Sequence, residues 1–261
     1  MSLKRLSKPF EGGKKVLVSY SMVGYPDFET SLRVFETLIE NGSDIVEVGY
    51  PFSDPVADGP TIQVAHERAL ENGIRFKDVL EAVEHLRQKY PDVPLLLMTY
   101  YNPVFKKGLE NFVAAFADAG IDGFIVPDLP PEESGELKKI ARKYDLATVM
   151  LAAPTSTPSR LKRICETTDV FTYYVSVTGI TGERDKLPLK ELAERMELYR
   201  SLCDKKVVVG FGISKKEHAK AIGSLADGVV VGSHFVKLAG RRDLGALAEA
   251  VRALKAGLEE I

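Results

Sequence analysis

Two closely spaced carboxyl groups, Glu47 and Asp58, are the residues best suited to chemistry in this sequence. Glu47 interrupts the apolar run Ile45–Gly49, and side chains alternate between the two faces of a strand. Val46 and Val48 would then share one face, with Glu47 on the other. Burial raises the pKa of a carboxyl group, which suits a group that must both give and take protons. The run therefore predicts an acid–base residue, with a structural ion pair as the alternative.

The segment that follows this run carries two further acids, Asp54 and Asp58, on a stretch stiffened by three prolines. Asp58 stands directly before Gly59-Pro60, which reads as a turn at the start of a helix. An aspartate at that position often caps the helix. The spacing alone leaves two roles open for Asp58, a helix cap and a catalytic partner of Glu47.

Three glycine-bearing turns form a second candidate site, which would bind an anion. Glycine lets backbone N–H groups approach an anion closely, and a helix N-terminus favours negative charge. Each turn alone is an ordinary loop feature, but three that follow the last three predicted strands indicate a phosphate site. They are Thr178–Gly182, Gly210–Ser214 and Gly232–His234.

Eight short runs rich in β-branched residues would position these groups, and amphipathic segments separate them. The runs are Lys15–Tyr20, Asp44–Gly49, Pro94–Tyr100, Asp122–Asp128, Leu146–Ala152, Val170–Ser176, Lys206–Gly212 and Asp227–Ser233. The helical segments are Phe28–Glu40, Pro60–Glu71, Phe76–Tyr90, Leu109–Asp118, Glu132–Tyr144, Pro158–Thr167, Leu189–Leu202, Lys215–Ser224 and Leu244–Glu259.

This alternation predicts an α/β fold with parallel strands, and eight units in 261 residues favour a (β/α)8 TIM barrel. A doubly wound sheet is the alternative. No linker divides the chain, so we expect residues 1–261 to form a single domain. Barrel enzymes build their sites at the C-terminal ends of the strands, where the acids and the glycine turns are expected. A barrel strand has no solvated face, which strengthens the prediction that Glu47 is buried.

Composition excludes several classes of function. The chain has 35 basic and 37 acidic residues and a formal net charge of −2, so no basic excess attracts nucleic acid or an anionic membrane. The N-terminus lacks a signal-peptide pattern, and no apolar stretch is long enough to span a bilayer. We therefore expect a cytoplasmic protein. Cys165 and Cys203 stand far apart in the sequence, and we expect two reduced thiols.

Two rival aldolase chemistries find little support. A Schiff-base enzyme needs a lysine at the C-terminal end of a strand, but Lys15 and Lys206 begin their runs. A metal-dependent enzyme needs several ligands that converge on one point, and we expect no metal. Three of the four histidines lie in predicted helices and the fourth in the last loop: His66, His85, His218 and His234.

The segment VEVGYPFSDPVADGPTIQ closely resembles the signature of tryptophan synthase alpha subunits. The resemblance covers nearly the whole chain. It continues through Met98–Phe105, Gly123–Glu133, Ala153–Thr157, Tyr174–Gly182, Gly210–Ser214 and Gly228–Lys237.

This resemblance implies a lyase that splits indole-3-glycerol phosphate into indole and glyceraldehyde 3-phosphate. Glu47 and Asp58 would be the catalytic pair, and Tyr173 would assist near the reacting hydroxyl. Tyr173 could equally be a core aromatic, because strand alternation does not settle its direction. The resemblance places the phosphate at Gly182, Gly212, Gly232 and Ser233, Thr181 on a closing loop, and the indole walls at Tyr20, Ile62, Tyr100, Ile125 and Phe211.

The resemblance also implies a partner, the tryptophan synthase beta subunit, in an α2β2 assembly. Pyridoxal phosphate is expected only in that partner, and no cofactor is expected in this chain. The Pro51–Pro55 loop, which includes Asp54, and the Tyr101–Phe105 segment would form much of the contact. The alternative function is a barrel subunit that binds a phosphate ligand and activates its partner, with little activity of its own.

The sequence departs from the family pattern at three places. The first strand ends in Val18–Gly24, where the family commonly has a Thr-Ala-Gly ending, and His234-Phe235 follows Ser233 where a small residue is commoner. The N-terminal segment is short and contains Gly12-Gly13, so we expect a reduced helix across the barrel floor. These departures concern pocket detail and partner fit.

Overall fold

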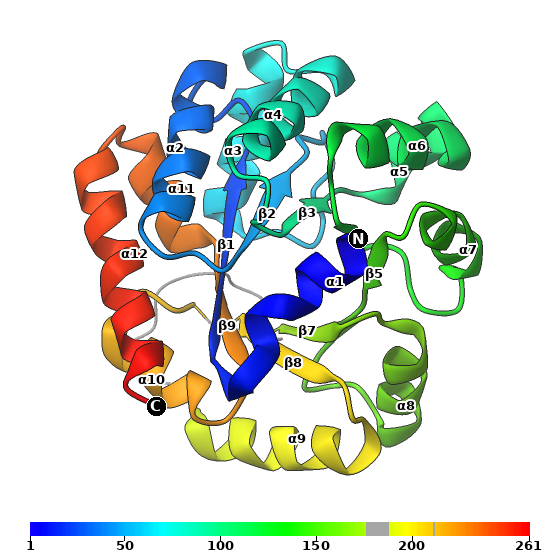
Figure 1. The fold of residues 1–261 in the computed structure, drawn as a ribbon, viewed down its shortest axis with the longest axis vertical. Helices are drawn as coiled ribbons and strands as arrows, with labels where there is room; N and C mark the ends of the chain where they lie inside the picture. The colour runs from blue at the N-terminus through cyan, green and yellow to red at the C-terminus, as the bar shows by residue number, and fades with distance from the viewer. Residues whose placement is uncertain (176–187, 211) are drawn as a thin grey trace.

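The computed structural model describes residues 1–175, 188–210 and 212–261, which form a ring of parallel strands surrounded by helices (Figure 1). The strands follow one another around the ring in the order β5-β4-β3-β2-β1-β9-β8-β7-β6. They are β1 Val16–Met22, β2 Ile45–Gly49, β3 Leu95–Met98, β4 Gly123–Ile125, β5 Ala147–Val149, β6 Leu151–Ala152, β7 Phe171–Val175, β8 Lys206–Gly210 and β9 Gly228–Val231.

The two ends of this sheet meet, so the sheet closes into a barrel. The strands at its ends, β5 and β6, are parts of one run interrupted only at Met150. The backbone N–H of Tyr173 donates to the carbonyl of Met150 at 3.0 Å, which keeps β7 paired across the interruption. All eight predicted runs contain a strand of this ring. The (β/α)8 barrel is confirmed, and the doubly wound sheet is wrong.

The helices form the outer layer of the barrel, apart from α1, which crosses one end of the strands (Figure 1). They are α1 Ser2–Ser7, the 3-10 helix η1 Lys8–Gly13, α2 Phe28–Glu40, α3 Pro60–Glu71, α4 Phe76–Lys89, α5 Tyr101–Lys107, α6 Leu109–Ala119, α7 Gly135–Lys143, α8 Pro158–Thr167, α9 Leu189–Leu202, α10 Lys216–Gly223, α11 Ser233–Gly240 and α12 Leu244–Glu259. No helix among the described residues has the length and apolar character needed to cross a bilayer.

Two apolar clusters fill the molecule, one between strands and helices and one inside the barrel. Val46 and Val48 belong to the outer cluster, and Ile45 belongs to the inner one. This is the alternation expected of a strand that is covered on both faces. The strand β2 therefore turns Glu47 toward the barrel interior, as its sequence predicts.

A short helical segment closes the barrel floor, with six residues in α1 followed by the 3-10 helix η1. Leu6 of α1 and Phe10 of η1 are buried and join the inner cluster. Gly12 adopts a positive φ of 69° and, just beyond Phe10, interrupts the helical geometry without removing this plug. Apolar side chains about one turn apart thus fill the bottom of the barrel, even in a short segment.

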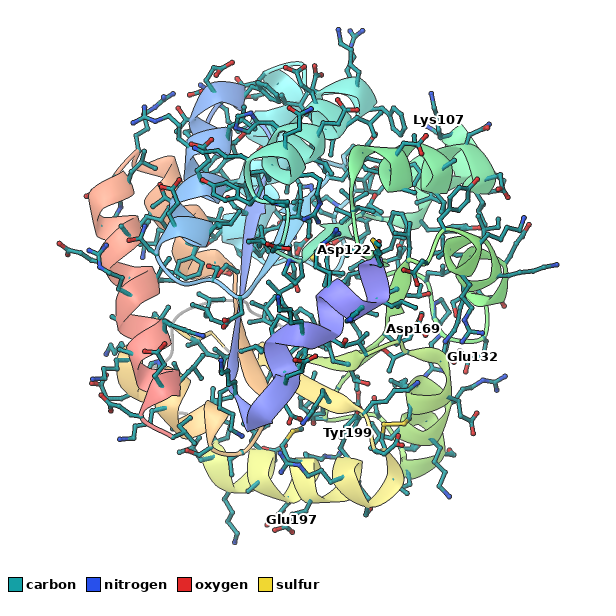
Figure 2. All side chains as sticks on the ribbon, viewed as in Figure 1. Lys107, Asp122, Glu132, Asp169, Glu197 and Tyr199 are labelled. Carbon is teal, nitrogen blue, oxygen red and sulfur yellow. A yellow bond between two sulfur atoms is a disulfide. The ribbon has the colours of Figure 1, made fainter. Side chains whose placement is uncertain are left out.

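Asp122 ties this floor segment to the barrel wall. Its side chain is fully buried just before β4 and pairs with Arg5 of α1 at 2.5 Å and with Arg87 of α4 at 2.7 Å. It also accepts a hydrogen bond from the backbone N–H of Leu95 at 2.9 Å. Figure 2 shows Asp122 close to the end of α1. The two guanidinium groups compensate the buried charge, and the network joins three elements at one point.

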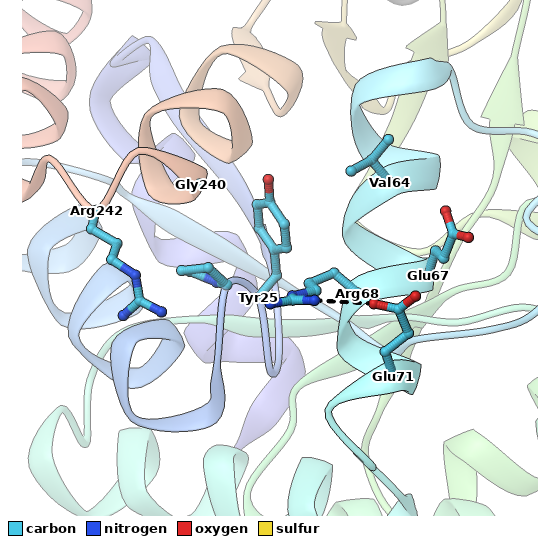
Figure 3. Close-up of a pocket in the computed structure, with 8 residues that line it drawn as sticks. Tyr25, Val64, Glu67, Arg68, Glu71, Gly240 and Arg242 are labelled. Carbon is cyan, nitrogen blue, oxygen red and sulfur yellow. Dashed lines mark hydrogen bonds and ion pairs between the residues drawn. The ribbon is translucent and has the colours of Figure 1, made fainter.

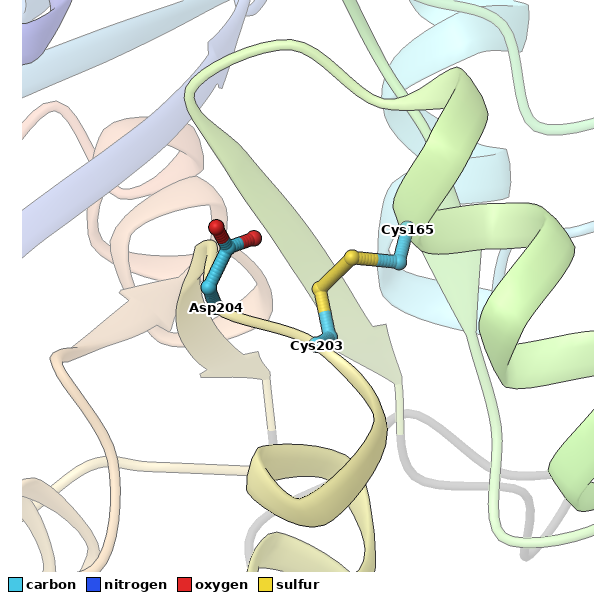
Figure 4. A group of neighbouring side chains, drawn as sticks. All are labelled: Cys165, Cys203 and Asp204. Carbon is cyan, nitrogen blue, oxygen red and sulfur yellow. A yellow bond between two sulfur atoms is a disulfide. The ribbon is translucent and has the colours of Figure 1, made fainter.

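Cys165 and Cys203 form a disulfide, so the expectation of two reduced thiols is wrong (Figure 4). The two residues are 38 positions apart, but α8 and α9 are neighbours in the outer layer, and their Cα atoms lie 5.7 Å apart. Spacing along the chain could not reveal this proximity, because it is produced by the packing of α8 against α9.

Two short helices were not predicted from the sequence. His234 lies in the first turn of α11 rather than in the last loop. The Tyr101–Phe105 segment lies in α5. Both helices are short and follow directly on the C-terminal ends of strands, so their few residues give too little periodicity to be recognised from sequence.

Candidate active site

Glu47 is the central residue of the candidate site. Its side chain has no exposed surface, and neither carboxyl oxygen has a hydrogen-bond partner among the described residues. Burial, followed by the charge of Asp58, raises the pKa of Glu47 to about 8. A carboxyl group in this state is protonated near neutral pH and ionises readily, so it can donate a proton and then take one back.

Asp58 is held by two side chains that approach the same oxygen. The hydroxyl of Tyr100 donates to Oδ2 of Asp58 at 2.7 Å, and Nε2 of His66 lies 3.0 Å from that oxygen. The cap position of α3 belongs to Gly59, and no side chain caps the helix. Asp58 is therefore not the helix cap, and its catalytic role stays a prediction.

Two tyrosine hydroxyls reach the same region from opposite sides of the barrel. Tyr20 is paired in register with Glu47, and a Cβ atom at Gly49 would lie 2.6 Å from the Tyr20 hydroxyl. Tyr173 packs against the inner cluster, and a Cβ atom at Gly210 would lie 2.9 Å from its hydroxyl. Both glycines thus leave room that a larger residue would fill.

The direction of Tyr173, which alternation left open, is inward. Burial, followed by the charges of Glu47 and Asp58, raises the pKa of Tyr173. Burial and the charges of Asp58, Tyr100, Glu47 and Tyr173 raise the pKa of Tyr20. Both phenols therefore lie within the electrostatic influence of Glu47 and Asp58 and keep their protons at neutral pH.

The expected phosphate end lies next to this group. A Cβ atom at Gly232 would lie 3.5 Å from the ring of Tyr20 and 3.6 Å from Ile62, so the turn after β9 adjoins the residue paired with Glu47. Gly232 is the N-cap of α11 and Ser233 its first residue, which leaves backbone N–H groups without helical partners at this end. Gly212 has a φ of 60°, a conformation that favours glycine.

Some of the remaining predicted residues belong to the described part of the chain, and others do not. Ile125 is fully buried at the end of β4 and belongs to the inner cluster. Tyr100 is also buried, and its ring stacks on Phe52 at 5.4 Å. Three further predicted residues lie outside the described residues: Thr181, Gly182 and Phe211.

Sequence reasoning missed one residue of this site, His66. It was assigned only to a helix, yet its side chain is buried and contacts Asp58. A signal was available. His66 and Ile62 stand four positions apart on α3 and therefore share one helix face, and Ala65 and Ala69 complete the buried stripe. A histidine within such an apolar stripe, beside a predicted wall residue, marks a buried polar contact.

A separate hollow of about 460 Å³ lies outside the barrel, between α3, the end of α11 and the turn before α2 (Figure 3). Most of its charged residues form ion pairs with neighbouring side chains. Arg68 pairs with Glu71, and Arg242 pairs with Asp27. None of the predicted site residues lines this hollow.

The barrel fold and the buried pair of carboxyl groups define a class, the TIM-barrel enzymes, whose sites lie at the C-terminal ends of the strands. Within it, residues 6–259 match the family described as tryptophan synthase alpha chain. The chain belongs to this family. It takes the alpha-subunit role in tryptophan biosynthesis, a lyase role exercised together with a beta chain.

Similar proteins agree with this assignment. A tryptophan synthase alpha chain from Aquifex aeolicus is 63% identical over 250 residues, which cover 96% of this chain and 95% of that protein. One from Geotalea daltonii is 44% identical over 249 residues, covering 94% of each.

Solved structures are similarly close. Tryptophan synthase from Mycobacterium tuberculosis contains a chain that is 36% identical, with a TM-score of 0.90 and coverage of 98% and 96%. Tryptophan synthase subunit alpha from Legionella pneumophila is 32% identical, with a TM-score of 0.91 and coverage of 100% and 99%.

Proposed function

We propose that this chain cleaves indole-3-glycerol phosphate into indole and glyceraldehyde 3-phosphate by an acid–base retro-aldol reaction. The observation that carries the proposal is Glu47, a fully buried carboxyl group inside the barrel with a pKa raised to about 8 and with no hydrogen-bond partner among the described residues. The buried and coupled Asp58 and the adjoining turn at Gly232 support it.

The carbon–carbon bond cannot break directly without expelling a poor carbanion. Glu47 in its acid form protonates C3 of the indole, which turns the ring into an electron acceptor. The carboxylate then removes the proton of the neighbouring hydroxyl, the bond to C3 breaks, and its electron pair returns to the ring. Indole and the aldehyde leave, and Glu47 ends protonated as it began.

Asp58 and Tyr173 complete the reaction centre in this proposal. Asp58 accepts a hydrogen bond from the indole N–H and stabilises the positive charge that develops on the ring. Tyr173, whose hydroxyl keeps its proton, would donate a hydrogen bond to the reacting hydroxyl. The walls of the indole pocket are Tyr20, Ile62, Tyr100, Ile125 and Phe211, and Thr181 belongs to a loop that would exclude water.

The phosphate is proposed to bind at the glycine turns that close the last strands, where backbone N–H groups can approach it. The residues are Gly182, Gly212, Gly232 and Ser233. Because the protonated indole ring itself accepts the electrons, the mechanism requires no cofactor or metal in this chain. Pyridoxal phosphate is assigned to the beta chain, and we place the assembly in the cytoplasm as an α2β2 complex.

The decisive experiment measures indole release from indole-3-glycerol phosphate by the chain alone and after addition of its beta chain. Glu47→Gln should bind inorganic phosphate as the wild type does but lose turnover by a factor of about 10² to 10⁴, because proton transfer is lost. Glu36→Gln, which alters an acid on the outer surface, is the control. Normal cleavage by the Glu47→Gln variant would reject the proposal and leave a binding or partner-activating role.

A further inference from the structure

The backbone N–H groups that begin the hydrogen-bond chains to Asp58 determine which atom donates in each of the following bonds. The backbone N–H of Phe52 donates to Nδ1 of His66 at 2.9 Å. A backbone N–H can only donate, so Nδ1 must be the unprotonated nitrogen of the ring. The proton of the neutral imidazole is then on Nε2, which lies 3.0 Å from Oδ2 of Asp58 and donates to it.

A second chain of the same kind reaches the same oxygen. The backbone N–H of Ala57 donates to the Tyr100 hydroxyl at 3.0 Å, and that hydroxyl donates to Oδ2 of Asp58 at 2.7 Å. Burial and Asp58 raise the pKa of Tyr100, so the phenol keeps the proton that it donates. Both chains begin in the backbone of the segment between β2 and α3 and end on one carboxyl oxygen.

The consequence is an oriented carboxylate. Two donors fix Oδ2 of Asp58, while no described residue donates a hydrogen bond to Oδ1. The Asp58 and His66 side chains are only 7% and 4% exposed, so water competes little for these contacts. The free oxygen is left to accept a hydrogen bond from a ligand, and its direction depends on the position of the imidazole.

We infer that His66 is a positioning residue for the reaction. As a neutral Nε2–H donor it orients Asp58 toward the indole N–H, and through Nδ1 it ties that orientation to the backbone of the Pro51–Pro55 loop. This inference rests on the role proposed above for Asp58. It adds a residue from α3 that does not contact the reacting atoms but sets the direction of one that does.

The test compares His66→Leu, which removes both hydrogen bonds at similar volume, with His66→Gln, whose amide can donate to Asp58 and accept from Phe52. We expect His66→Leu to lower kcat/KM by about 10- to 100-fold, the scale for a hydrogen bond to a charged group. His66→Gln should recover most of that loss. His85→Leu, which removes a histidine paired with Glu36 on the outer surface, should behave as wild type.

A double-mutant cycle separates positioning from a general effect on packing. Its readout is the affinity for indole, which does not require turnover. His66→Leu should weaken indole binding in the wild-type background and have no further effect in the Asp58→Asn background. A full effect of His66→Leu in the Asp58→Asn background, or wild-type behaviour of His66→Leu, would overturn the inference. If instead Asp58→Asn itself leaves cleavage unchanged, the proposed function is at fault.

The third measurement uses the unaltered protein and does not depend on a variant that folds. Nitrogen-15 NMR of histidine-labelled protein distinguishes the two neutral tautomers from the imidazolium ion. We expect the Nε2–H tautomer for His66 at neutral pH. An Nδ1–H tautomer or an imidazolium would be incompatible with the Phe52 contact and would overturn the inference.

Discussion

The proposed chemistry depends at the residue scale on one carboxyl group kept from water. Glu47 has neither a hydrogen-bond donor nor a counter-charge among the described residues, so burial governs its proton affinity. Nearby, Asp58 receives two donors on one oxygen. The same kind of side chain is thus placed in two different environments, and the proposed reaction uses one as the proton carrier and the other as the hydrogen-bond acceptor.

The pH dependence of cleavage follows from this environment. The raised pKa of Glu47, about 8, means that the acid form needed to protonate C3 persists through neutral pH and is lost above it. We expect kcat/KM to be flat below about pH 7 and to fall tenfold per pH unit well above pH 8. Steady-state rates of indole release between pH 6 and 10 check this. A rate that rises through pH 8 would contradict the assignment of Glu47 as the initial acid.

At the scale of elements, short strands carry the site, and the helices that follow them supply its supports. Glu47 lies on the strand β2, and Asp58 lies in the segment that follows it. His66 of α3 then contacts Asp58. The floor is also built from a short segment, because α1 and η1 contribute the buried Leu6 and Phe10 to the inner cluster and pack the partly buried Leu3 against it. The attachment of α1 depends on the Asp122 network.

Asp122→Asn should therefore destabilise the protein. The substitution leaves Arg5 and Arg87 beside a neutral group in a partly buried place, and breaking a buried pair in this way costs about 3 kcal/mol. Thermal unfolding followed by circular dichroism gives the change. Asp118→Asn on the exposed face of α6 serves as the control, and equal stability of the two variants would show that the network contributes nothing.

At the scale of the whole molecule, closing the ring brings distant residues together and leaves the rim of the barrel available to a partner. The disulfide between Cys165 and Cys203 joins neighbouring helices whose cysteines are 38 residues apart. Phe105 lies in the Tyr101–Phe105 segment that is expected to contact the beta chain, and Val56 directly follows the expected Pro51–Pro55 loop. Both are exposed apolar side chains, with Val56 80% and Phe105 67% exposed.

Removal of the disulfide should lower stability. A cross-link that closes a loop of 38 residues is worth up to about 4 kcal/mol in the chain-entropy account. We expect a reducing agent to lower the melting temperature of the wild type and to leave a Cys165→Ser, Cys203→Ser double variant unchanged. Mass spectrometry after alkylation without reduction identifies the linked peptides. Free thiols in the native protein would show that the bond is absent.

The beta-chain contact expected near Val56 and Phe105 can be tested separately from the chemistry. Val56→Asp and Phe105→Asp should each weaken binding of the beta chain by about tenfold or more, because a charge replaces apolar surface buried on assembly. Ile261→Asp, an exposed apolar residue at the C-terminus, is the matched control. Sedimentation of mixtures measures the affinity. Unchanged binding by both rim variants would move the contact elsewhere.

The sequence by itself determined the eight strands, their parallel order and the inward direction of Glu47, because these follow from local periodicities of two and 3.6 residues. The roles of Tyr20 and Ile62 as walls of an indole pocket, which come from the resemblance, stay predictions. The sequence did not reveal two short helices. Both α5 and α11 contain too few residues for a periodic pattern to stand out.

Only the tertiary structure decided which side chains hold Asp58, which way Tyr173 points, how the floor is filled and that Cys165 meets Cys203. Each of these depends on contacts between residues far apart in the chain. Closing eight units into a ring sets the distances between such residues, and no pattern within a single unit records that closure. The physical reason is that periodicity fixes the face on which a residue lies, whereas packing fixes its neighbours.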